Sequence, residues 1–143
     1  MIFDIDQLAA SRQASYRLVV GHNPAEGDAP AEEVGFVVMG PNSEEYQKAS
    51  REAAIDGVQK AEKRGAEKVE AGSRESAEAW LAAREASNDA VVLGCTIGWF
   101  GFRRAGKPAP FNRSNLESVL KSRPHWRQRI LTAIENSANF GEG

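Results

Sequence analysis

The stretch Val34-Gly35-Phe36-Val37-Val38-Met39-Gly40-Pro41-Asn42-Ser43-Glu44-Glu45-Tyr46 decides the fold, because its hydrophobic pattern changes in the middle. Its first six residues are mostly β-branched or aromatic, which predicts a strand that ends at the Gly40-Pro41 turn signal. The charged residues that follow predict a helix over about 43–64. Asn42 is the expected N-cap of this helix, and Glu45 is expected to complete a capping box.

Two long helices are expected, each with apolar residues at helical spacing that predict one apolar stripe. The second helix is expected to be capped by Ser73 and to end near Ile97 or Gly98. The charged stretch near 62–74, which contains two glycines, is the expected mobile connection between them. The first stripe consists of Tyr46, Ala49, Ala53, Ile55, Val58 and Ala61, and the second of Ala77, Trp80, Leu81, Arg84, Val91, Val92 and Cys95.

The β-rich part of the chain is predicted near its start. A strand over 16–21, followed by the turn signal at 22–28, could pair antiparallel with the strand over 34–39, perhaps with residues 2–8 alongside. A two-stranded sheet is marginally stable alone, so its apolar face should be covered by helices or by another subunit. The expected fold class is therefore α+β.

The C-terminal quarter is expected to contain a turn and two short helices. Residues 99–111 predict an aromatic-anchored turn or short hairpin, and the pattern from Ser114 to Glu117 is a capping box that opens a helix. Pro124 should start the last helix, with a buried stripe of Trp126, Ile130, Leu131, Ile134 and Ala138. We expect one domain over 1–143, with a small antiparallel β element in 1–41 and a mainly helical part in 42–143.

Several functions are excluded by composition and spacing. The first residues lack the basic and apolar regions of a secretion signal, and no apolar run approaches a membrane span, so a cytoplasmic protein is expected. Cys95 is the only cysteine and is expected to be a buried hydrophobe, while His22 and His125 add no metal-ligand spacing. Neither a metal nor a cofactor is expected.

No catalytic constellation stands out in the sequence. Gly101 to Lys107 matches G-x-x-x-x-G-K, but Pro108 replaces the hydroxyl residue that a phosphate-binding loop needs for magnesium. Paired carboxylates occur between lysines and arginines, which is typical of a solvent-facing helix. We therefore expect a protein that is not an enzyme.

Charge is distributed unevenly along the chain. Residues 101–135 contain eight basic and two acidic residues, whereas residues 1–43 contain two basic and six acidic ones. Such a basic region among aromatic residues could bind nucleic acid, although no recognition motif accompanies it and the whole chain has net charge −2. It could instead pair with the acidic part of a second copy, giving a head-to-tail homo-oligomer. The candidate basic patch is Arg103, Arg104, Lys107, Arg113, Arg127 and Arg129.

Five stretches together resemble one protein family, and they cover nearly the whole chain in order. They are Phe3-Asp4-Ile5, Asn23-Pro24, the residues from Val37 to Tyr46, the residues from Cys95 through Gly106-Lys107-Pro108 to Asn112, and the ending Ala138-Asn139-Phe140. In this order the chain resembles the tail assembly chaperones that long-tailed bacteriophages and prophages encode between the tube protein and the tape measure protein.

The resemblance implies a function based on protein binding. It implies that the chain coats the tape measure protein in the bacterial host cytoplasm, helps to recruit tail tube protein, and is absent from the mature virion. The alternatives are a minor structural component of the tail and a nucleic-acid-binding adaptor. A groove for an amphipathic helix is the expected partner site, formed by Trp99, Phe100, Phe102, Phe111 and Trp126.

Overall fold

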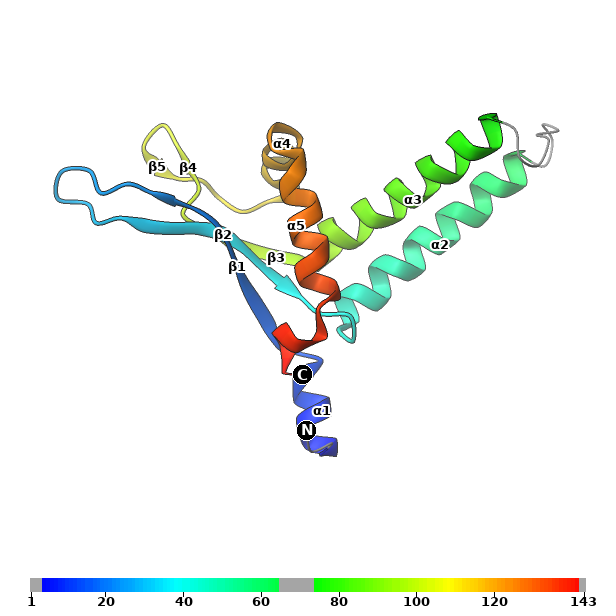
Figure 1. The fold of residues 1–143 in the computed structure, drawn as a ribbon, viewed down its shortest axis with the longest axis horizontal. Coiled ribbons are helices and arrows are strands. Elements are labelled where there is room, and N and C mark those ends of the chain that lie inside the picture. The colour runs from blue at the N-terminus through cyan, green and yellow to red at the C-terminus, as the bar shows by residue number, and fades with distance from the viewer. Residues whose placement is uncertain (1–3, 65–73, 142–143) are drawn as a thin grey trace.

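A three-stranded antiparallel sheet is the centre of the α+β fold in the computed structural model, which describes residues 4–64 and 74–141 (Figure 1). The strands lie in the order β1–β2–β3. Leu18 pairs with Phe36, and Phe36 pairs with Trp99. The predicted antiparallel pairing of the first two strands is therefore confirmed. The strands are β1 (Ser15–Asn23), β2 (Glu32–Met39) and β3 (Thr96–Phe100).

The third strand comes from a different segment than the sequence suggested. Residues Ile5–Ser11 form helix α1, because the Asp4 side chain accepts a hydrogen bond from the backbone N–H of Asp6 (2.8 Å) and caps a helix there. The third strand is β3, which directly follows helix α3 (Arg74–Cys95). The end of this helix was expected near Ile97 or Gly98, and it lies slightly earlier, at Cys95. A strand is favoured there by the β-branched and aromatic residues that follow.

Two helices begin one or two residues away from the predicted cap. Helix α2 (Glu44–Arg64) is capped by Ser43, not Asn42: the buried Ser43 hydroxyl accepts from the Tyr46 N–H (3.1 Å) and donates to the Gly40 carbonyl (2.6 Å). Helix α4 (Arg113–Ser122) is capped by Asn112, so the predicted box that begins at Ser114 already lies inside the helix. In both places another residue with a short polar side chain takes the cap.

The last helices cover one face of the sheet. Helix α5 (Pro124–Glu135) begins at the predicted proline, and the short 3-10 helix η1 (Ser137–Phe140) packs against β1. Ala138 lies in η1 and is exposed, so it does not continue the buried stripe. The core between sheet and helices contains Phe36, Val38, Cys95, Leu116, Leu120, Ile130 and Ile134.

Helices α2 and α3 (Arg74–Cys95) lie side by side and extend away from the sheet (Figure 1). Their ends next to the sheet enter the core, where Ala49, Val91, Val92 and Cys95 are buried. Their distal part, residues 52–64 and 74–87, is called the arm below. The two predicted apolar stripes reach into the arm, and among the described elements none other packs over it (Figure 1). Its exposed large apolar residues are Ile55, Val58, Trp80 and Leu81.

The predicted mobile connection is only partly within the described chain. Residues 62–64 belong to helix α2, whereas 65–73, including the proposed cap Ser73, lie outside the described residues.

Candidate protein-binding site

Four of the five aromatic residues expected to form a groove lie together with the fully buried Phe36. Ring centroids are 4.7 Å apart for Trp99 and Phe102, 5.5 Å for Trp99 and Phe111, and 6.0 Å for Phe102 and Trp126. Phe36 lies 5.1 Å from Phe102 and 6.0 Å from Trp126. The rings fill the space between them, so this aromatic cluster anchors the surrounding elements, and Phe111, 37% exposed, is its outward member.

The aromatic cluster holds the hairpin predicted over 99–111. Strands β4 (Arg103–Arg104) and β5 (Lys107–Pro108) pair antiparallel, and the Trp99 indole N–H donates to the Ala109 carbonyl (3.0 Å). The match to a phosphate-binding loop lies in this hairpin. A phosphate-binding loop leads from a buried strand into a helix, whereas this segment leads from β3 into the two exposed strands of the hairpin, so its geometry is that of a turn.

Phe100, the fifth aromatic residue, lies on the opposite face of the sheet. Side chains alternate along a strand, so the neighbour of Trp99 points away from the aromatic cluster. Phe100 pairs with Gly35, and a Cβ at that glycine would come within 2.7 Å of the ring. The Arg17 guanidinium lies 3.8 Å from the ring centroid and forms an ion pair with Glu33. This face of the sheet is thus covered by its own side chains at Phe100.

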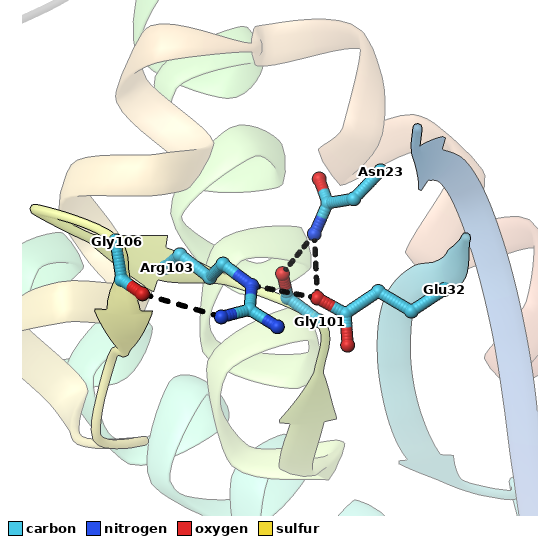
Figure 2. A network of polar contacts seen from close by, with 5 residues as sticks. All are labelled: Asn23, Glu32, Gly101, Arg103 and Gly106. Carbon is cyan, nitrogen blue, oxygen red and sulfur yellow. Dashed lines mark hydrogen bonds and ion pairs between the residues drawn. The ribbon is translucent and has the colours of Figure 1, made fainter. Parts of the chain in front are cut away.

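A polar network joins the β4–β5 hairpin to the distal ends of β1 and β2 (Figure 2). The Asn23 amide nitrogen donates to the Glu32 carboxylate (2.9 Å) and to the Gly101 carbonyl (2.7 Å). Arg103 donates through Nε to the same Glu32 oxygen (2.7 Å) and through Nη1 to the Gly106 carbonyl (3.3 Å). Glu32 therefore accepts from two sides and fixes the position of the hairpin.

The network should make stability depend on acid pH. Hydrogen bonds from Arg103 and then Asn23 hold the pKa of Glu32 below its ordinary value of 4.5. A lowered pKa stabilises the folded state above the unfolded pKa, and this contribution is lost as pH falls through the folded pKa. We expect Glu32→Gln to reduce the change of the urea unfolding midpoint with pH between about pH 5 and pH 3. Arg103→Gln should reduce this pH dependence similarly. If the urea midpoint of Arg103→Gln changes with pH as in the unchanged protein, the pH dependence belongs to other carboxylates.

The six residues of the candidate basic patch are distributed over several contacts within the chain. Arg103 pairs with Glu32, so one contact between the basic C-terminal region and the acidic N-terminal part forms within a single molecule. Arg127 and Arg129 bind different elements: Arg127 pairs with Asp89 of α3 (3.2 Å), and Arg129 donates to the Val19 carbonyl of β1 (3.0 Å). Of the others, Arg104 donates to Asn115, Arg113 pairs with Glu117, and Lys107 is exposed on β5.

The exposed apolar surface of the arm was missed by sequence reasoning. Ile55, Val58, Trp80 and Leu81 are 51%, 60%, 61% and 51% exposed. Their helical spacing was recognised, but they were not among the candidate partner-binding residues. The missed signal was helix length: α4 and α5 have 10 and 12 residues, whereas α2 and α3 have 21 and 22. At 1.5 Å per residue, helices of such unequal length leave about half of the longer pair uncovered.

Two observations on the described residues concern Cys95 and possible metal ligands. Burial and the nearby charge of Glu45 raise the pKa of the Cys95 thiol to about 12, so this fully buried side chain is not a thiolate at neutral pH. Within 4–64 and 74–141, His, Cys, Asp and Glu form no group that could hold a metal ion. A hollow of about 510 Å³ between α1, the end of β2 and the start of α2 is lined mainly by Ala9, Arg12, Met39, Glu44, Glu45 and Ile97.

Two further findings concern whether a helix could cross a membrane and whether known proteins match the chain. In the described part, no helix combines the length and the apolar character needed to cross a bilayer. No protein-family model, curated protein or solved structure matches the chain.

Proposed function

We propose that the chain is a tail assembly chaperone of a long-tailed bacteriophage or prophage, and that it binds the tape measure protein through the arm. The observation that carries this proposal is the arm itself, with four large apolar side chains at least half exposed on two helices that leave the folded body. The stretches that resemble the chaperone family support the same function. In this function the protein also assists the assembly of tail tube protein and leaves before the virion is complete.

Exposing the large apolar side chains of the arm to water is unfavourable in free energy. Four large apolar side chains exposed on one projecting pair of helices provide apolar area that another protein can cover. Burying a tryptophan or leucine side chain contributes roughly 1.5–3 kcal/mol, so covering Trp80 and Leu81 can drive binding. A long helical protein such as the tape measure protein would present repeated apolar stripes that need this cover until the tube encloses it.

A minor structural component of the tail would use the same surface but would stay in the particle. Mass spectrometry of purified particles separates these functions, because a chaperone is nearly absent from them. A nucleic-acid adaptor has less support, since five of the six basic residues already contact other groups of the chain.

Co-expression with the tape measure protein of the same phage tests the proposal. We expect the intact chain to keep the tape measure protein in the soluble fraction and to co-purify with it. The double variant Trp80→Ser with Leu81→Ser should reduce the co-purified amount by at least about tenfold, since two half-exposed apolar side chains would be lost from the interface.

Ile97→Ser is the matched control. Ile97 is 46% exposed but lies on β3, away from the arm, so this variant should behave like the intact chain. Circular dichroism should show that both variants are folded. Equal recovery of tape measure protein with the arm variant and the intact chain would contradict the proposal.

A further inference from the structure

Strand β1 lies at an edge of the three-stranded sheet, since β2 is its only strand partner among the described residues. Along such a strand, the backbone groups of successive residues point alternately toward the partner strand and away from it. The Leu18 carbonyl points toward β2, because a Cβ on Gly35 would lie 1.9 Å from its oxygen. The N–H and C=O groups of Arg17 and Val19 therefore point away from the sheet. An edge of this kind can pair with a strand of another molecule.

The side chain of Arg129 reaches this edge from helix α5. Its Nη2 donates to the Val19 carbonyl (3.0 Å), and its Nη1 donates to the Val20 carbonyl (3.5 Å). Both carbonyls lie where the register of β1 against β2 shifts, between Val19 and Gly21. One charged side chain thus occupies an acceptor that a further strand would need on this edge.

The space beside this contact is open. The short helix η1 covers one end of β1, where the rings of Tyr16 and Phe140 lie 6.3 Å apart. A hollow of about 350 Å³ lies between β1 and α5, and its lining includes Tyr16, Leu18, Arg129 and Asn139. The edge next to the hollow is therefore covered by the Arg129 side chain and not by a packed helix.

The identical edge of a second copy is the strand that fits here. If two β1 strands meet antiparallel with Leu18 opposite Leu18, the outward groups of Arg17 face those of Val19. In this register no like charges lie directly opposite each other, since each arginine meets a valine. The same register needs the Val19 carbonyl, which Arg129 holds in the single chain.

We infer that Arg129 is a clasp on the β1 edge, which keeps two copies of the chain from joining their sheets through antiparallel β1 strands. The clasp is exposed, so its replacement should leave the fold intact. It lies on the sheet and does not involve the arm, so the clasp and the proposed function can fail separately.

Sedimentation velocity over a range of protein concentrations tests the clasp. We expect Arg129→Gln to self-associate at least about tenfold more tightly than the intact chain, because the shorter, uncharged glutamine releases the Val19 carbonyl. The matched control is Arg127→Gln, which removes the same charge from the same helix but releases Asp89 of α3 and not the β1 edge. This control should associate no more tightly than the intact chain.

A second substitution shows whether the association uses the β1 edge. Val19→Pro removes an N–H that points away from β2, so the ladder between β1 and β2 keeps its hydrogen bonds. Added to Arg129→Gln, it should return self-association to that of the intact chain. Hydrogen exchange gives an independent readout: in Arg129→Gln alone, the backbone amides of Arg17 and Val19 should exchange more slowly at high protein concentration than at low.

Several outcomes would overturn the clasp. One is an Arg129→Gln chain that associates no more tightly than the intact chain, and another is equal association of Arg127→Gln. Association that Val19→Pro leaves unchanged, with concentration-independent exchange at Arg17 and Val19, would place the contact on another surface. Loss of the folded circular dichroism spectrum in Arg129→Gln would also overturn it, because Arg129 would then be needed for folding.

Discussion

Replacing Phe36 by alanine is expected to lower the free energy of unfolding by about 3–5 kcal/mol. Phe36 is fully buried in the central strand and contacts the rings of Phe102 and Trp126. Its removal leaves a cavity that the paired strands on both sides cannot close. Since single domains are stable by only about 5–15 kcal/mol, much of the margin would be lost. Urea unfolding followed by tryptophan fluorescence measures the change.

Phe111→Ala is the matched control for this variant. Phe111 belongs to the same aromatic cluster but is 37% exposed, and its ring contact in the aromatic cluster is with Trp99. Water can replace the lost ring, so we expect a loss of less than about 2 kcal/mol. Equal losses in the two variants would mean that Phe36 is not the centre of the core.

Gly35→Ala is expected to destabilise the protein by about 3 kcal/mol or to prevent folding, because a side chain has no space there. A Cβ at this position would lie 1.9 Å from the Leu18 carbonyl oxygen and 2.7 Å from the Phe100 ring. The first neighbour is backbone of the adjacent strand and cannot rotate away. Thermal unfolding by circular dichroism measures the loss, and an unchanged midpoint would contradict the packing of Phe100 on Gly35.

Gly98→Ala provides the comparison on the same face of the sheet. Gly98 pairs with Val37, and a Cβ there would meet the Val37 side chain at 3.9 Å, an ordinary contact. The alanine also restricts the unfolded chain, which by itself stabilises by about 0.4–1 kcal/mol. We therefore expect Gly98→Ala to be neutral or slightly stabilising.

The sequence predicted the fold class because its local signals agree with the final contacts. The β-branched run at 34–39 became the central strand, and the proline at 124 began the last helix. Two boundaries were misjudged, at Asn42 and Ser114, because several residues near each helix start have side chains able to cap it. The third strand was assigned to the wrong segment, since strand pairing depends on distant residues and local propensity does not determine it.

The candidate site was predicted only in part, for two physical reasons. Aromatic residues pack on one another as readily as on a partner, so Trp99 and Trp126 could not be assigned to core or surface from spacing. Helical spacing likewise predicts a stripe but not how far the rest of the molecule covers it. For this reason Trp80 and Leu81 were assigned to one side of a helix but not to the candidate site, although they are exposed on the arm.

The most direct test of the arm as binding surface is hydrogen exchange of the chain alone and in complex with the tape measure protein. We expect slower exchange of backbone amides in residues 77–90 of the complex, with little change in β1 and β2. Slower exchange at the β4–β5 hairpin and the aromatic cluster, with unchanged exchange along α3, would contradict it.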